Sequence, residues 1–429
     1  MTQLQRTLKL TDGLAMVVGI MVGTGIFRTP GIVVGELGRP ALVLLLWIAG
    51  GALACLGALV FAELSTRFPH AGGKYVYARE AYGPRAALVV GWVEGLGIYP
   101  VAIAAIGVVA GEFTARLLGW PPGASRWLGT GLVVLLTGVN LVGVGTGRRV
   151  QNLVTGAKVL ALAGVVAAAF VAGDGAGWHG TASAAPSGTA LWGAFALAFQ
   201  AVIWTYYGYP DAAKIAEEVV DPGRVLPRVF LIGLGVVTAL YLLLNAAFFN
   251  VLPLDHIASS NLVPGDVMAA IFGGRAGALM AAVALLIVLA SLNGNIFVTP
   301  RVLFGLARDG LAPGALARVN RGGTPWAAML VVGAVSVALA ATGTFQQLLS
   351  LAITLILLVD GFTVTALFPL RRRNAAAPFR VPLYPAVPVA FLAVYAALFI
   401  ATVVAQPMVA ALGAGVLLAA YLVAGTLRR

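Results

Sequence analysis

The sequence is poor in cysteine, and this absence excludes one class of assembly. Its only cysteine among 429 residues is Cys55, so no disulfide can form within the chain. Cys55 lies inside an apolar run, and the polar loop at residues 117–126 has no cysteine through which to join another chain. The sequence therefore predicts no disulfide-linked ancillary subunit.

Histidine and charge are also scarce. The three histidines, His70, His179 and His256, fall between apolar runs and show neither metal-ligand spacing nor a nucleophile–base motif. The Gly-rich stretch that ends in Lys74 is not a phosphate loop, because no strand precedes it and no Gly-Lys-Ser/Thr ends it. We expect no enzyme, no metal site and no cofactor.

Long apolar runs dominate the chain. Hydrophobic residues make up 60% of it, charged residues 10%, and the mean hydropathy is +0.98, which indicates a polytopic membrane protein. Spans of roughly 20 residues are predicted, twelve in all, at 11–35, 40–66, 86–115, 127–146, 151–172, 190–219, 227–252, 275–300, 325–342, 345–369, 385–405 and 407–427.

The net charge of +12 reports topology and not a nucleic-acid partner. Residues 1–10 are predicted to be cytoplasmic, and most of the 27 Lys and Arg residues then fall in cytoplasmic loops. The exceptions are Arg39, Arg116, Arg126 and Arg275 on the outer side, with Arg28 and Lys158 inside spans. We therefore predict a multi-pass protein of the inner (plasma) membrane with both termini cytoplasmic.

The first span carries Gly23-Thr24-Gly25 near its middle. Glycines there cost about 1 kcal/mol each against alanine and favour local unwinding. We expect one half-helix to end near Val22 and another to begin near Ile26, so that their free carbonyls and N–H groups bind a zwitterion between them. The alternative is that Gly19 and Gly23 form a close helix-packing face.

A second break is predicted in the sixth span near Gly208-Tyr209, because Pro210 removes a donor and disfavours helix at the preceding residue. Breaks five spans apart are the pattern of two inverted repeats whose interrupted helices meet at a midplane site. The predicted fold is an all-α membrane protein with a 5+5 inverted repeat, residues 11–172 and 190–369. Two additional C-terminal helices lie in 385–427.

Two ionisable residues lie within spans at similar predicted depth. Glu94 and Lys158 are each about eight residues from the cytoplasmic side, or roughly 12 Å deep at the helical rise, so they are able to share a layer. Ionisable groups there are functional candidates. The alternatives are snorkelling for Lys158 and a structural pair for Glu94.

The stretch Gly19 to Pro30, GIMVGTGIFRTP, resembles the first-helix signature of the amino acid–polyamine–organocation transporters, and within them the L-type amino acid transporters. The resemblance continues in residues 57–64 and 72–75, in 150–152 ahead of Lys158, in 217–227 and in 291–301. It covers about residues 11–325 and implies the LeuT-like fold. It further implies a secondary transporter of amino acids that works by alternating access.

The resemblance also implies roles for residues. Lys158 would stand where related sodium-coupled transporters bind sodium, touching carbonyls near Val22 and Gly23 and the hydroxyl of Ser291. The substrate carboxylate would bind amides of the second half-helix, its ammonium would bind carbonyls at both breaks, and four side chains would line the pocket. The carboxylate would bind the amides of Thr24, Gly25 and Ile26, and the ammonium would bind the carbonyls of Met21, Trp204 and Tyr207. The side-chain pocket would be lined by Ile98, Ala102, Thr354 and Leu357. Trp204 would close over the substrate from outside, or act as apolar filler.

The chain departs from the family at Tyr207, where relatives for cationic amino acids carry Asp. A tyrosine narrows the pocket and removes the counter-charge, which favours small or medium neutral amino acids. Asp211 keeps an amine, polyamine or cationic amino acid substrate as an alternative. Arg28 either guards the outer vestibule or snorkels, and Asp360 is either a proton site or a structural group.

We therefore expect a sodium-independent exchanger or proton-coupled symporter that is a monomer or weak homodimer in the lipid membrane. A membrane amino acid receptor without transport is the alternative from another class. A channel is disfavoured, because polar residues cluster only at the two breaks and form no continuous pore.

Overall fold

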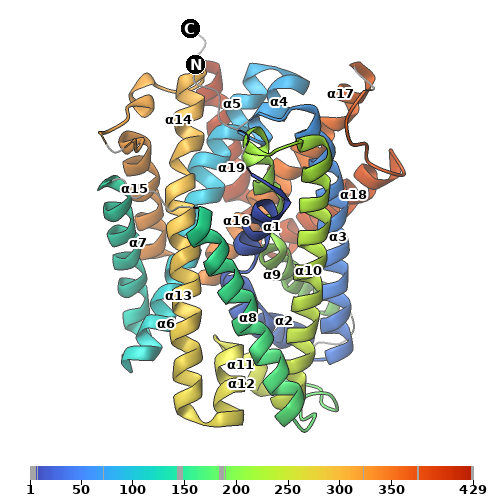
Figure 1. Ribbon diagram of the computed structural model, residues 1–429, viewed down its shortest axis with the longest axis vertical. Helices are drawn as coiled ribbons and strands as arrows, with labels where there is room; N and C mark the ends of the chain where they lie inside the picture. Colours follow the sequence, from blue (N-terminus) through green and yellow to red (C-terminus); the bar gives the residue numbers. More distant parts are fainter. Residues whose placement is uncertain are drawn as a thin grey trace.

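The structure is a computed structural model, and it describes residues 6, 8–70, 72–142, 148–182, 188, 190–321, 323–373 and 376–426. Residues 1–5 and 7 of the predicted cytoplasmic segment 1–10 lie outside this description. Figure 1 shows an elongated bundle of helices that run along the long axis. The only β pairing in the described part is an isolated bridge between Leu8 and Val219.

Eight helical stretches in the described part are long and apolar enough to cross a membrane, and a bent helix pair makes up to nine. The bent pair is α1 (Leu10–Met21) with α2 (Thr24–Leu37). The other stretches consist of α3 (Pro40–Arg67), α5 (Pro84–Trp92) with η1 (Val93–Ile98) and α6 (Tyr99–Leu118), α8 (Arg148–Ala172), α9 (Ala190–Tyr206) with η3 (Tyr209–Glu218), α10 (Pro222–Val251), α13 (Gly274–Val298) with α14 (Pro300–Arg308), α16 (Phe345–Thr365) with α17 (Leu367–Arg373), and α18 (Ala386–Ala405).

The three remaining predicted spans also contain helices, which are not among these stretches. They are α7 (Ser125–Val142), α15 (Trp326–Thr342) and α19 (Pro407–Thr426). Short elements connect the long ones: α4 (Lys74–Tyr82), η2 (Pro122–Ala124), α11 (Leu254–Ser259), α12 (Val263–Phe272) and η4 (Gly314–Ala317). The structure is thus all-helical, with a helix in each predicted range.

The side chains of α8 show that one face of this helix is exposed and the other is buried. Leu153 and Leu160 are 76% and 73% exposed, whereas Lys158 between them is buried. Apolar side chains therefore face the surroundings of the bundle, and the ammonium points inward. This excludes the snorkelling alternative for Lys158.

Proline and a π-helical turn shape the third predicted span. Pro100 cannot donate the N–H that would continue the α-helical pattern, and the turn before it, η1, is π-helical, with the N–H of Tyr99 bonded to the carbonyl of Glu94. Glu94 is fully buried in this turn. π-helical turns inside α-helices occur frequently at functional sites.

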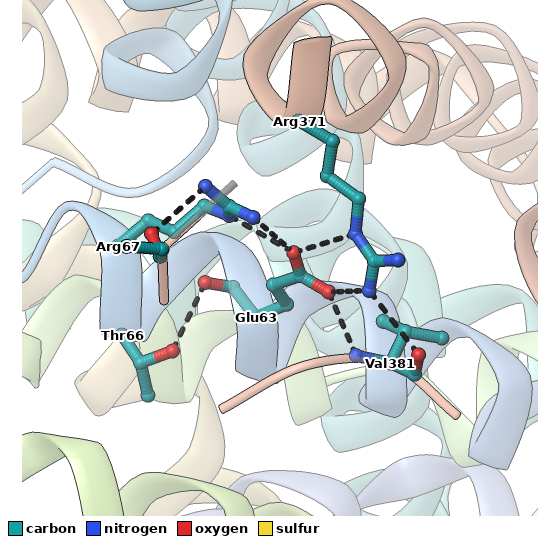
Figure 2. Close-up of polar contacts among 6 residues, drawn as sticks. Glu63, Thr66, Arg67, Arg371 and Val381 are labelled. Carbon is teal, nitrogen blue, oxygen red and sulfur yellow. Dashed lines mark hydrogen bonds and ion pairs between the residues drawn. The ribbon is translucent and has the colours of Figure 1, made fainter. Parts of the chain in front are cut away.

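A buried carboxylate fixes the end of α3. The Glu63 side chain is completely buried and accepts hydrogen bonds from Arg67 Nε at 2.9 Å, Arg371 Nε at 2.8 Å and the Val381 N–H at 2.7 Å (Figure 2). These bonds tie α3 to α17 and to the segment after it. The end of the bundle that carries α4, α5 and α17 lies opposite the end that carries α11 and α12 (Figure 1).

Candidate functional site

The first predicted break is present, with slightly different bounds. α1 ends at Met21 and α2 begins at Thr24, and the two half-helices meet at an angle of 44°. The predicted start near Ile26 is therefore two residues late. The N–H groups at the start of α2 have no partner within the helix, so the N–H groups of Thr24 and Gly25 are available to an anionic group.

Gly25 allows α2 to touch the backbone of α9. A Cβ at this position would lie 2.8 Å from Thr205 Cα and 2.6 Å from Thr205 Oγ1. Next to this contact, the Thr205 hydroxyl donates to the Thr29 hydroxyl across the same interface at 2.8 Å. The contact places the start of α2 directly against the last turn of α9.

The second predicted break is also present. α9 ends at Tyr206, and the chain continues as the 3₁₀ helix η3 after Gly208, whose φ is 127°. That conformation favours glycine, and a Cβ at Gly208 would lie 2.7 Å from Ile20 Cγ2 and 3.4 Å from the backbone nitrogen of Met21. The two breaks therefore pack against each other near the centre of the bundle.

A tyrosine that the sequence did not single out joins the two breaks. The Tyr241 hydroxyl on α10 lies 2.8 Å from the Met21 carbonyl and 3.1 Å from the Thr205 carbonyl. The Met21 carbonyl also accepts the Gly23 N–H at 2.9 Å. Since a carbonyl has two lone pairs, the role expected for Met21 in binding a substrate ammonium requires one of these bonds to give way.

The two breaks line a cavity of about 70 Å³. Of the expected substrate contacts, seven line it: Met21, Thr24, Gly25, Ile98, Ala102, Trp204 and Tyr207. Ile26, Thr354 and Leu357 do not line it, and Ile356 of α16 takes the place expected for Thr354 and Leu357. The Thr354 hydroxyl instead donates to the Ser350 carbonyl of its own helix at 2.7 Å.

Lys158 reaches the carbonyl end of α1. Its Nζ lies 3.2 Å from the Gly19 carbonyl, 3.4 Å from the Val22 carbonyl and 3.4 Å from Ser291 Oγ. A Cβ at Gly23 would lie 3.4 Å from the same serine oxygen. An ammonium group is thus surrounded by oxygen atoms at the negative end of a half-helix, where a cation is favoured.

Glu94 forms a structural pair, which is the alternative that the sequence left open for it, and its partner is Lys74 and not Lys158. It lies 3.4 Å from Lys74 Nζ, which also contacts Asp360 Oδ1 at 2.6 Å and the Tyr207 hydroxyl at 2.5 Å. Burial lowers the pKa of Lys74, but Asp360 and Glu94 raise it by more, so the pKa stays above its ordinary value. The ammonium of Lys74 therefore holds α4, η1 and α16 together beneath the cavity.

Asp211, in the first turn of η3, lies in the wall of the cavity. Its Oδ1 accepts hydrogen bonds from the Tyr99 hydroxyl at 2.7 Å and from Lys214 Nζ at 2.7 Å. Lys214 Nζ also lies 3.9 Å from the centre of the Tyr99 ring. Asp211 thus faces the cavity as half of an ion pair and not as an isolated anion.

Arg28 pairs with a glutamate of α6 that the sequence reading overlooked. Its guanidinium contacts Glu112 and lies 4.6 Å from the centre of the Phe345 ring on α16. The two charged side chains are only 17% and 21% exposed, so Arg28 does not extend freely to solvent. The pair bridges α2 and α6 near α16.

Among the described residues, no group of three His, Cys, Asp or Glu side chains is arranged to hold a metal ion. The cavity wall presents the N–H groups of α2, the Ser291 hydroxyl, the Asn295 side-chain amide and the side chains of Tyr99, Tyr207 and Asp211. The remaining wall is apolar. Such a cavity suits a small molecule with a charged end and a short side chain.

Comparison with known proteins agrees with this geometry. The family model described as amino acid permease matches residues 8–426. The chain is 30% identical over 392 residues to the serine/threonine exchanger SteT of Bacillus subtilis (strain 168), which covers 90% of this chain and 88% of the relative. It is 30% identical over 420 residues to the Asc-type amino acid transporter 1 of Mus musculus, a match that covers 96% of this chain and 79% of the relative. It is 29% identical over 420 residues to the b(0,+)-type amino acid transporter 1 of Homo sapiens, a match that covers 95% of this chain and 84% of the relative.

Proposed function

Because the chain belongs to the amino acid permease family, whose members are transporters and not enzymes, we propose that it is a sodium-independent exchanger of small or medium neutral L-amino acids. The observation that carries the proposal is the position of Lys158. Its ammonium lies among the carbonyls of Gly19 and Val22 and the hydroxyl of Ser291. A fixed positive charge there takes the place of a bound sodium ion.

The substrate backbone binds at the start of α2 in this proposal. The N–H groups of Thr24 and Gly25 hold the α-carboxylate, aided by the positive end of the half-helix dipole. The Ile26 N–H belongs to the same group, although its side chain lies away from the cavity. The α-ammonium binds carbonyls of the second break at Trp204 and Tyr207, with Met21 as a further acceptor.

The substrate side chain lies against Ile98, Ala102 and Ile356. Two features of the wall support a neutral side chain. Position 207 carries a tyrosine and therefore no carboxylate, and its hydroxyl is already bound to Lys74 Nζ at 2.5 Å. Asp211 is paired with Lys214 at 2.7 Å, which also disfavours an amine, polyamine or cationic amino acid as substrate.

We infer alternating access by two inverted repeats, 11–172 and 190–369, around this site, with the helices of 385–427 outside them. An even number of spans, twelve, would put both termini on the same side of the membrane. The distribution of Lys and Arg favours the cytoplasmic side. Trp204 and the pair formed by Arg28 and Glu112 close the outer side. Lys74 with Glu94 and Asp360 closes the inner side.

The transporter works in the plasma membrane as a monomer or weak homodimer without a disulfide-linked partner. Cys55, the single cysteine, lies within α3 and is partly buried, which supports the absence of a disulfide-linked partner. Exchange is favoured over proton symport because the Bacillus relative is an exchanger by name.

The test is uptake of radiolabelled neutral amino acids into proteoliposomes. We expect uptake that requires amino acid inside the vesicle and proceeds without sodium or a pH gradient. Lys158→Ala should abolish or uncouple it, whereas Lys9→Ala, which removes an exposed lysine, should not.

Uptake driven by a sodium gradient, or unchanged uptake by Lys158→Ala, would overturn the assignment of Lys158. Uptake that needs a pH gradient would replace exchange by proton symport. Amino acid binding without any uptake would favour a receptor.

A further inference from the structure

Asp211 has a free acceptor atom next to the cavity. Its Oδ1 is occupied by the Tyr99 hydroxyl and by Lys214 Nζ, both at 2.7 Å. Within the described part of the chain, Oδ2 has neither a hydrogen bond nor an ion pair. The side chain is 16% exposed and belongs to the cavity wall, so Oδ2 is the available acceptor.

Lys214 changes what this acceptor selects. A carboxylate without a counter-charge would favour an ammonium group, but Lys214 already supplies the positive charge and is held in place over the Tyr99 ring. Lys214 repels a second cation at Oδ2, and this repulsion opposes the attraction from Asp211 and from Glu94 and Asp360, which lie near the same pair together with Lys74. A hydroxyl is neutral and donates one hydrogen bond, so it meets the acceptor without this repulsion.

The position of Asp211 relates it to the substrate side chain. Its partner Tyr99 lies one helical turn from Ala102 on the same face of α6, and Ile98, Tyr99 and Ala102 all line the cavity. Asp211 is therefore next to the apolar part of the wall that Ile98 and Ala102 form. The cavity of about 70 Å³ leaves room for a short side chain beside it.

We propose that Asp211, neutralised by Lys214, accepts a hydrogen bond from the side-chain hydroxyl of the substrate, so that the site prefers short hydroxy amino acids. This rests on the proposed function, because it assumes that the cavity is the amino acid site. A side chain without a hydroxyl leaves Oδ2 without a partner. A hydrogen bond to a charged group is worth enough to predict about a 10- to 100-fold preference for serine over alanine.

The experiment measures competition for uptake into proteoliposomes by two pairs of unlabelled amino acids. Serine against alanine tests the hydroxyl, and homoserine against 2,4-diaminobutyrate tests a hydroxyl against an ammonium on a similar chain. For the wild-type protein we expect serine and homoserine to compete better than their counterparts. Each variant is judged by these ratios and not by its absolute rate.

Two variants of the pair have opposite expectations. Asp211→Ala should bring the serine-to-alanine ratio close to one. Lys214→Met should leave the carboxylate without its counter-charge and raise competition by 2,4-diaminobutyrate at least tenfold relative to homoserine. Asp221→Asn changes an exposed aspartate after η3 and should leave both ratios as in the wild-type protein.

Equal competition by serine and alanine in the wild-type protein would overturn the proposal, and so would a serine preference that survives Asp211→Ala, which would assign the hydroxyl to Ser291 or Asn295. Wild-type preference for 2,4-diaminobutyrate would make Asp211 a cation-selecting group instead. In all three cases amino acid uptake persists, whereas failure of the proposed function would remove uptake of every amino acid.

Discussion

Tyr241→Phe tests whether a single hydroxyl holds the two helix breaks in register. The hydroxyl is buried and bonds to the carbonyls of Met21 and Thr205, one on each broken helix. Phenylalanine keeps the ring, which packs against Trp47 and Tyr206 at centroid distances of 5.5 and 5.3 Å. The substitution therefore removes the hydrogen bonds and little else.

The expected magnitude follows from what the two carbonyls keep. Met21 retains the Gly23 N–H at 2.9 Å, whereas Thr205 lies at the end of α9 and has lost the helical partner that a longer helix would provide. Leaving one buried carbonyl unsatisfied costs about 1–3 kcal/mol. If that cost falls on the arrangement that binds substrate, the affinity should fall by about 5- to 150-fold.

The assay compares Tyr241→Phe with Tyr206→Phe. Tyr206 is buried next to Tyr241, and its hydroxyl donates to the Trp47 carbonyl at 3.0 Å, a bond that joins α9 to α3 and does not involve the first break. Both variants should lose thermal stability, but only Tyr241→Phe should raise the KM for uptake. A KM change in Tyr241→Phe no larger than that in Tyr206→Phe would refute the reasoning.

Four further substitutions, in three experiments, test contacts between the helices. Gly25→Ala should destabilise the protein by about 1–3 kcal/mol and abolish uptake, because the new methyl group meets the backbone Cα of Thr205 as well as its side-chain Oγ1; normal uptake would show that α2 and α9 separate easily. Glu63→Gln should cost about 3–5 kcal/mol of stability, because it leaves two guanidinium groups without their carboxylate; a thermal-shift assay measures it, and an unchanged Tm contradicts it. Arg28→Gln and Glu112→Gln should be non-additive by about 0.5–3 kcal/mol in a double-mutant cycle, whereas additive losses would show that the two residues act independently.

The two helix breaks could be predicted from the sequence because each depends on backbone chemistry that is visible in the residue names. Gly23-Thr24-Gly25 lies where a continuous helix has no reason to carry glycine, and Pro210 follows a glycine with a positive φ at Gly208. The restart of the first helix is two residues earlier than predicted, since four N–H groups are free at any helix start and the sequence does not mark the first.

The partners of the buried charges could not be predicted in the same way. Helical rise gives the depth of Glu94 but not the direction in which it points, so Lys74 could not be identified as its partner. Lys74 itself read as an ordinary basic residue of a cytoplasmic loop. Only the packing of α4 against α16, which brings it to Asp360, reveals that it is buried.

The face of α16 was misjudged for a related reason. Positions 354 and 357 were expected to line the cavity, but Ile356 does so. Positions 354 and 356 differ by about 200° around a helix. Most residues of α16 between 348 and 360 are buried, so no polar stripe marks the outward face, and hydrophobic periodicity fails where every face is covered. Tyr241 was missed similarly, as one tyrosine in an apolar run.

The proposed exchange mechanism is explained by the backbone groups that the first break leaves without partners. In a bilayer, irregular backbone is tolerated only where protein or a cavity satisfies it. Tyr241 and Lys158 satisfy the carbonyl side of the first break, but the N–H groups of Thr24 and Gly25 face the cavity. Closing the site around substrate gives these donors a carboxylate, whereas closing it empty leaves them without one at about 1–3 kcal/mol for each group. The return step should therefore be slow without substrate, so we expect net uptake into empty vesicles to lag behind exchange by at least about tenfold.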